Sequence, residues 1–243
     1  MKTTAVFFFA IVFHASTSVN CQNLNLDVSG AGIGANGVVR FNDPSLMGES
    51  KGVRLDYLDI RGNCFLYEDW EPAVIKLLNK SSVKFSRLKI NLYTGQVHYF
   101  GSNNVEMVSG LKLVDAIFFV NSQDSTKISK SIKKMIFENY EYLFQVLTTG
   151  KYELLKRTTV TLFKGEYDVS KARNDYRFIR KNDYFLFFDG RLKKIEELNR
   201  ENLASLLPID ENSDKWLKQN KNKLKNEDQL LAFLSYINLQ IGK

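Results

Sequence analysis

Residues 184–195 read YFLFFDGRLKKI, and residues 227–241 read EDQLLAFLSYINLQI. The first stretch joins two strand-like runs through the turn dipeptide Asp189-Gly190, which is typical of a β-hairpin. Apolar residues in the second stretch recur at helical spacing: Leu230, Phe233, Leu234, Ile237 and Ile241. A stripe of that width must pack on another surface. The change from a period of two to a period of 3.6 near Ile195 therefore predicts a sheet followed by helices that cover part of it.

Upstream of this hairpin, short apolar or alternating runs separated by turn residues extend from Val53 to Arg191, which is the signature of strands. The expected strands are residues 53–57, 74–78, 88–93, 96–100, 105–108, 113–120, 140–147, 152–157, 175–179 and 184–188. We expect the polar triplet at residues 181–183 to form a turn between the last two of these strands. Residues 127–134 fit either a short helix or a solvated loop, because isoleucines at helical spacing alternate there with lysines.

Three helices are predicted after Ile195. Asn199 can cap the first, which Pro208 stops after Leu207. Asp210 or Ser213 can cap the second, and Glu227-Asp228 opens the third. The predicted fold is mainly β with C-terminal helices (α+β). It has antiparallel sheets, arranged as a sandwich or an open barrel, followed by two or three short helices.

The N-terminus has the pattern of a secretory signal peptide over residues 1–21. Lys2 supplies a positive start, residues 5–13 form an apolar run, and a short polar stretch precedes Cys21. The apolar run is too short to remain as a membrane span. We therefore expect an exported protein that is periplasmic, envelope-associated or secreted, with no transmembrane segment in the mature chain.

The remaining chain divides by composition and periodicity. Residues 22–52 form a glycine-rich lead-in, residues 53–195 an antiparallel β domain, and residues 196–243 a helical segment packed on the sheet. Lipidation of Cys21 is the minority alternative, because Asn20 stands where a small residue is needed. Once Cys21 leaves with the signal peptide, Cys64 is the one remaining thiol, so a hydrophobic core must supply the stability.

The formal net charge of +7 is compatible with acidic partners, although an ordinary solvated surface rich in lysine is the simpler interpretation. An exported protein seldom meets nucleic acid, so acidic envelope polymers and lipid head groups are the more accessible polyanions. The simplest interpretation of the lysines between residues 215 and 225 is a solvated helix face. The helical ending and irregular strand lengths speak against an outer-membrane barrel.

Residues that carry common chemistries are scarce. His14 belongs to the signal peptide, and His98 and Cys64 are too few for a zinc site. The glycines of residues 30–34 lack the strand, the helix and the Gly-Lys-Ser/Thr ending of a phosphate loop. The sequence thus predicts no catalytic, cofactor-binding or metal-binding residues and no cofactor, and it favours a protein that is not an enzyme.

One enzymatic alternative remains open in the sequence. Glu68, Asp69 and Glu71 surround Trp70, and acids beside aromatics are what glycan hydrolysis uses. One carboxyl group must have a raised pKa while the other stays charged. The same residues, followed by Pro72, also describe an exposed turn before a strand, which is the simpler interpretation.

Residues 60–70 resemble the Gly-Ser-Pro-Tyr/Phe-Leu-x-x-x-Trp/Phe opening of a group of small exported Bacteroidota proteins with no assigned activity. Asn63 and Cys64 stand where serine and proline are expected. Later segments are similar as well: residues 88–93, 150–157 and 176–192, followed by the lysine-rich helical tail. The resemblance covers residues 60 to 240. It implies an envelope or secreted β protein, and it supplies no catalytic residues.

Taken with the scarcity of chemical groups, this resemblance gives the expected function. We expect a non-enzymatic binding or assembly component of the cell envelope, whose partner is an envelope protein or polymer. The alternative is a glycan-directed hydrolase that uses carboxylates near Glu68 to Glu71.

Overall fold

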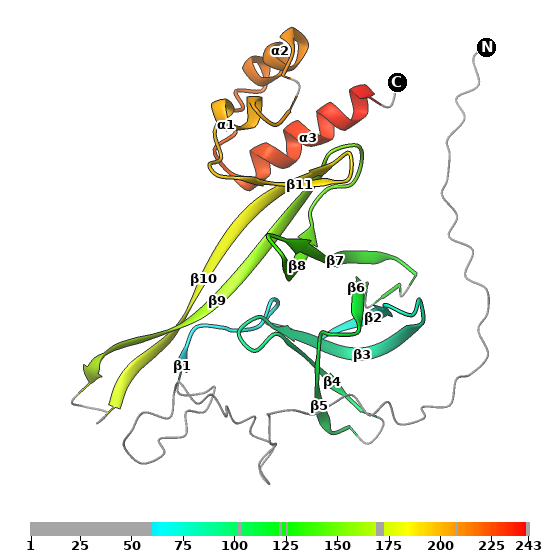
Figure 1. Ribbon diagram of the computed structural model, residues 1–243, viewed down its shortest axis with the longest axis vertical. Coiled ribbons are helices and arrows are strands. Elements are labelled where there is room, and N and C mark those ends of the chain that lie inside the picture. The colour runs from blue at the N-terminus through cyan, green and yellow to red at the C-terminus, as the bar shows by residue number, and fades with distance from the viewer. Residues whose placement is uncertain are drawn as a thin grey trace.

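One large sheet carries a cap of three helices at one end (Figure 1). The computed structural model describes residues 60–101, 104–121, 123–124, 126–168, 173–207 and 209–241. The predicted signal peptide, the glycine-rich lead-in and the strand expected at residues 53–57 lie outside this range.

The strands, all counted within the described residues, are β1 (Ile60–Arg61), β2 (Glu71–Leu77), β3 (Ser82–Asn91), β4 (Gln96–Phe100), β5 (Glu106–Gly110), β6 (Val114–Val120), β7 (Ile128–Phe137), β8 (Tyr140–Val146), β9 (Glu153–Asp168), β10 (Arg173–Phe188) and β11 (Arg191–Ile195). The helices are α1 (Arg200–Ala204), α2 (Glu211–Gln219) and α3 (Glu227–Ile241). The order in the sheet is β1-β10-β9-β8-β7-β6-β2-β3-β4-β5, with β11 also on β10. Its pairs are antiparallel except β1 with β10, and the sheet is not closed. The predicted class, mainly β with C-terminal helices, is confirmed.

Local signals placed the end of the sheet and the starts of the helices correctly, although α1 ends at Ala204 and not at Leu207 as predicted. Asp189 and Gly190 both have positive φ, 48° and 72°, at the turn between β10 and β11. This is the conformation that an Asp-Gly turn supplies at low cost. The side chain of Asn199 caps α1 by accepting from the backbone N–H of Asn202, and Asp210 caps α2 in the same way through Ser213. Asp210, rather than Ser213, is therefore the cap of the second helix.

Two sequence predictions within the sheet are wrong. Residues 181–183 do not turn the chain but continue β10, which pairs with β9 from Arg173 to Phe187. The polar residues are tolerated inside a strand because each finds a partner there: Asn182 accepts from Thr158 at 2.8 Å, and Asp183 binds Arg157 at 2.8 Å.

Residues 127–134 form neither a helix nor a loop, because Ile128 to Lys134 lie in strand β7. Ile132 is fully buried between β6 and β8. Three lysines of this strand bind carboxylates from elsewhere in the sequence: Lys130 pairs with Glu71, Lys133 with Glu153 and Lys134 with Glu141. Because carboxylates neutralise these ammonium groups, the strand tolerates its lysines.

The segment after β1 connects two distant parts of the sheet. Leu66 donates its backbone N–H to Ile90 in β3 at 2.8 Å, and Leu92 donates to Cys64 at 2.9 Å. On the other side, the guanidinium of Arg180 in β10 donates to the carbonyl oxygens of Phe65 and Leu66. This segment therefore holds β10 against the β3 end of the sheet.

The helices and the upper end of the sheet share one core. From the sheet and the connection before β9 it includes Tyr152, Leu154, Leu186 and Ile195. From the helices and their loops it includes Leu203, Leu207, Leu217, Leu224, Leu230, Phe233, Leu234 and Ile237. We call α1 to α3 with their loops, residues 200–241, the helical cap. Its predicted stripe is buried except for the last member, Ile241, which is 43% exposed.

Polar contacts fix α3 on the sheet at both ends. Near its start, Glu227 accepts from Lys156 at 2.9 Å and from the hydroxyl of Tyr184 at 2.7 Å. Burial, together with the hydrogen bond to Glu227, raises the pKa of Tyr184 above its usual range. Near its end, the Asn238 amide accepts from the backbone N–H of Tyr152 and donates to the Tyr152 carbonyl, both at 2.9 Å. Asn238 thus takes the place of a strand partner for Tyr152.

Gly150, in the connection before β9, is required by this docking. Its φ is +138°, and a Cβ there would lie 2.6 Å from the Asn238 side chain. We expect Gly150→Ala to lower the free energy of unfolding by more than about 1 kcal/mol, since the native conformation does not suit alanine. Gly110→Ala is the matched control, because nothing lies within 4 Å of that Cβ. Chemical denaturation of both variants measures the difference, and equal stabilities would refute the assigned role of Gly150.

Candidate functional site

The three carboxylates suggested by the sequence lie at the start of β2 and on the bend before it. Glu68 and Asp69 are exposed on the bend before β2. Glu71, at the start of β2, accepts from Lys130 at 2.6 Å, and Trp70 packs edge-on against Phe100 with ring centroids 4.7 Å apart. None of the surface hollows described below is lined by these acids. The hydrolase alternative stays a prediction from the sequence.

His98 and Cys64 are both buried, each about 1% exposed. His98 Nδ1 lies 2.7 Å from a Glu106 carboxylate oxygen on the adjacent strand, and the ring packs edge-on against Phe65. Across the residues with defined positions, no three histidine, cysteine or acidic side chains gather so as to hold a metal ion. His98 is therefore a core residue of β4 that is paired through Nδ1, whereas its buried Nε2 has no hydrogen-bond partner among the described residues. The phosphate-loop-like glycines at residues 30–34 lie outside the described residues.

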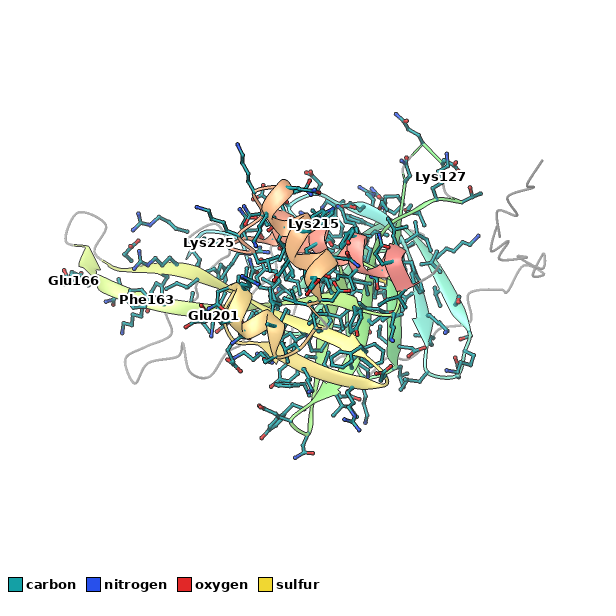
Figure 2. All side chains as sticks on the ribbon, turned by 90° about the horizontal axis from the view of Figure 1, so that it is seen from above. Lys127, Phe163, Glu166, Glu201, Lys215 and Lys225 are labelled. Carbon is teal, nitrogen blue, oxygen red and sulfur yellow. The ribbon has the colours of Figure 1, made fainter. Side chains whose placement is uncertain are left out.

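The most exposed feature of the sheet is the far end of β9 and β10. β8 pairs with β9 only at Leu155 and Lys156, and β11 pairs with β10 only from Tyr184 onward. Beyond these points the two strands continue as a two-stranded ribbon that projects from the molecule (Figure 1), and Figure 2 shows Phe163 and Glu166 on this ribbon. We call this ribbon, residues 158–168 and 173–182, the arm. Among the described strands, only β1 pairs with the arm, at Tyr176 and Arg177.

The two faces of the arm differ. Strand pairing places Phe163 opposite Arg177 and Thr161 opposite Ile179, so these four side chains share one face. The opposite face carries Val160, Leu162, Tyr176 and Phe178, which pack with Ile60 and Cys64. We call the first set, together with Thr159 and Lys181, the outer face. Ile179 is 42% exposed and Phe163 is 43% exposed, so apolar surface on the outer face is left in solvent.

Cations accompany this apolar surface. The guanidinium of Arg177 lies 4.8 Å from the centroid of the Phe163 ring, and Arg177 has no ion-pair partner within the described parts of the chain. Lys181 lies 3.5 Å from Asp183 at the base of the arm. The outer face therefore combines an exposed ring, an exposed branched side chain and two cations on a two-stranded ribbon.

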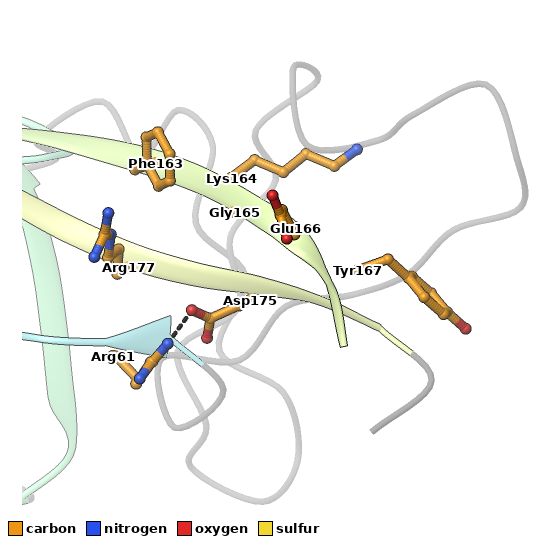
Figure 3. A pocket seen from close by; sticks show the side chains of 8 residues that line it. All are labelled: Arg61, Phe163, Lys164, Gly165, Glu166, Tyr167, Asp175 and Arg177. Atoms are coloured by element: carbon orange, nitrogen blue, oxygen red, sulfur yellow. Dashed lines mark hydrogen bonds and ion pairs between the residues drawn. The ribbon is translucent and has the colours of Figure 1, made fainter. Parts of the chain in front are cut away.

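A shallow hollow of about 650 Å³ lies at the far end of the arm (Figure 3). Its lining residues are Arg61, Phe163, Lys164, Gly165, Glu166, Tyr167, Asp175 and Arg177. Arg61 and Asp175 form an ion pair across it. The other charged residues in its lining are Lys164, Glu166 and Arg177. A Cβ at Gly165 would lie 2.9 Å from the Asp175 carbonyl oxygen, so the glycine allows the two strands to meet where the pairing register shifts.

A buried ion pair supports the base of the arm. Arg157 in β9 donates to Asp183 in β10 at 2.8 Å, and both side chains are at most 15% exposed. Aromatic rings enclose the guanidinium, with Tyr142 at 4.5 Å and Phe185 at 5.1 Å from it. Burial alone would raise the pKa of Asp183, but the hydrogen bond and charge of Arg157, with Lys181, outweigh it and lower the pKa. This pair fixes the register of β9 on β10 where the arm leaves the body.

Sequence reasoning missed this surface because it divided β10 in two. A signal was present, since residues 158–163 are β-branched or large apolar residues without a turn residue among them. That run predicts that the strand expected at residues 152–157 continues past residue 157. A partner strand of the same length would then run through residues 181–183 without a turn.

No helix in the described part of the chain is long and apolar enough to cross a bilayer. Comparisons with protein-family models, with curated proteins and with solved structures found no match for this chain.

Proposed function

We propose that this chain is a non-enzymatic binding component of the cell envelope, and that the outer face of the arm contacts an acidic polysaccharide. Export is part of the proposal and is supported by the signal-like N-terminus and by the resemblance of residues 60–70 to small exported Bacteroidota proteins. The observation that carries the binding function is the bare outer face, where Phe163 and Ile179 are exposed beside Arg177 and Lys181.

This composition suits a polymer that offers both ring faces and carboxylates. Exposed aromatic side chains supply large contact area at low conformational cost, and an arginine pairs with a carboxylate through two parallel hydrogen bonds. Side chains two residues apart on one strand share a face, so Phe163 and Thr161 present successive contacts along the ribbon. An extended polymer lying along the arm meets these contacts without the need for an enclosed pocket.

The net charge supports an acidic partner. Basic residues exceed acidic ones by seven in the whole chain. Such an excess raises the rate of encounter with polyanions, and binding that depends on it weakens as salt is added. Because an aromatic contact responds little to salt, the two parts of the outer face can be separated by experiment.

The test is binding of the protein to polygalacturonate, with neutral dextran as the control polymer. We expect the double variant Phe163→Ala/Arg177→Ala to bind at least about tenfold more weakly, which is the effect of losing one charge-assisted hydrogen bond. The melting temperature should change little, because both side chains are exposed. Isothermal titration calorimetry at two salt concentrations measures the affinity and its electrostatic part.

The matched control is Lys84→Ala/Tyr140→Ala, which removes one exposed cation and one exposed ring from elsewhere on the sheet. This control should bind as the unaltered protein does. Equal weakening by both double variants would show that only net charge matters. Binding to dextran as strong as to polygalacturonate would exclude an acidic ligand, and either result would overturn the proposal.

A further inference from the structure

A second surface hollow lies in the helical cap, away from the arm. It has a volume of about 500 Å³ and lies between the start of α1, the end of α2 and the loop that follows α2. Its lining residues are Arg200, Asp214, Leu217, Lys218, Lys221, Asn222, Lys223 and Leu224. Four cations therefore face a single carboxylate, and Asp214 is already bound to Arg200.

The lysines of the cap differ from those of the sheet. In β7, Lys130, Lys133 and Lys134 each bind a carboxylate. By contrast, Lys218, Lys221 and Lys223 are exposed and have no ion-pair partner among the residues that the structure describes. The three lysines line the same hollow as the buried Leu217 and Leu224, so this cluster of cations borders apolar surface. Attraction between opposite charges is stronger beside surface of low polarity than in bulk water.

Lys221 occupies a backbone position that glycine suits better. It follows the C-cap Asn220 with a φ of 49°. Its N–H donates to Lys218, and the N–H of Asn222 donates to Leu217. This is the Schellman ending of a helix, in which glycine normally takes the left-handed position. A lysine at this position lowers the stability of the fold. Attraction between a cation and the helix C-terminus does not explain its presence, because Lys218 already supplies a cation in the last turn.

The loop after α2 is also held rigidly. Leu224 has a second positive φ, 55°, although its side chain is fully buried in the cap core. Asn222 fixes the loop by accepting from the backbone N–H of Leu224 at 2.9 Å and donating to the carbonyl of Gln229 at 2.7 Å. A strained backbone that its surroundings hold in place is common at ligand sites.

We infer that this hollow, which we call the cap site, binds a phosphate-bearing anion through Arg200, Lys218, Lys221 and Lys223. A phosphate group carries up to two negative charges and three acceptor oxygens, which suits several ammonium groups better than one carboxylate would. Lysine binds phosphate as a point charge, without the planar geometry that a carboxylate pair demands of arginine. Free oligophosphates and phospholipid head groups share this chemistry.

The decisive experiment compares two lysine-to-glycine changes in the full chain. Lys221→Gly should raise the melting temperature, because glycine fits the left-handed position, and should weaken binding of tripolyphosphate about fivefold, the effect of one lysine at an anionic surface. Lys225→Gly makes the same chemical change at a residue that does not line the hollow. It should leave tripolyphosphate binding unchanged, as measured by calorimetry at low salt.

Vesicles distinguish the two sources of phosphate. If the protein sediments with phosphatidylglycerol vesicles, and if Lys221→Gly reduces this binding while Lys225→Gly does not, the cap site binds a lipid head group. Saturable binding of tripolyphosphate with the same variant pattern, but without vesicle binding, would assign it to a free phosphate. Equal weakening by both variants would overturn the inference, and so would the absence of saturable binding to either probe.

Discussion

Asp183→Ala is expected to lower the free energy of unfolding by about 3–5 kcal/mol, because it leaves the guanidinium of Arg157 buried without its carboxylate. The Arg157 side chain is 15% exposed and lies among aromatic rings, so little water can replace the lost partner. Urea denaturation followed by tryptophan fluorescence measures the loss. The arm should be affected first, since this pair lies where β9 and β10 leave the body of the sheet.

Two controls separate the buried charge from the loss of contacts. Asp175→Ala breaks the ion pair with Arg61, whose side chain is 69% exposed, and should cost no more than about 1 kcal/mol. The double variant Arg157→Met/Asp183→Leu removes both charges and should recover most of the stability lost by Asp183→Ala. A double variant as unstable as the single one would contradict this account of the pair.

The same pair predicts how stability depends on pH. Arg157 and Lys181 lower the pKa of Asp183 in the folded protein despite its burial. A carboxyl group whose pKa is depressed in the folded protein stabilises the fold when the pH is above its unfolded-state pKa of about 3.9. This stabilisation is lost as the pH falls through the folded-state pKa. The stability difference between the unaltered protein and Asp183→Asn should therefore be constant near pH 7 and shrink below pH ~4. A stability difference that grows as the pH falls would contradict the depressed pKa of Asp183.

The contacts of Asp183 also explain why the sequence was misleading at this point. Lysine, asparagine and aspartate in succession favour a turn when only neighbouring residues are considered. In the fold, Asn182 and Asp183 bind Thr158 and Arg157, which lie 24 and 26 residues earlier in the chain. A strand that depends on such distant partners has no local signature, so its continuity could not be predicted from turn propensities.

The helices were predictable because their signals are local. Asn199 and Asp210 bind N–H groups three residues ahead, and the stripe in α3 repeats within a single element. Strand β7 shows the opposite case, since Lys130 is neutralised by Glu71, which lies 59 residues away. The outer face of the arm was beyond sequence reasoning for a further reason: whether Phe163 is core or surface depends on which strands fail to extend alongside it.

The second large effect concerns the docking of α3. Leu234→Ala should lower the free energy of unfolding by about 2–5 kcal/mol, because Leu234 is fully buried in the core shared by the cap and the sheet. Leu239→Ala makes the same change five residues later in the same helix. Leu239 is 69% exposed, so this variant should differ from the unaltered protein by no more than about 0.5 kcal/mol.

The signal used to follow unfolding decides what this pair of variants reveals. Trp216 lies in the cap, stacked on Tyr236 with ring centroids 5.0 Å apart, whereas Trp70 lies immediately before β2. The shared core contains Leu154 and Leu186 from the sheet, so loss of the cap would leave apolar strand surface in water. We therefore expect fluorescence from Trp216, isolated by replacing Trp70 with phenylalanine, to change at the same denaturant concentration as the far-ultraviolet circular dichroism of the sheet. In Leu234→Ala both signals should shift together. A cap signal that shifts alone would mean that α1 to α3 unfold as a separate unit and that the sheet is stable without them.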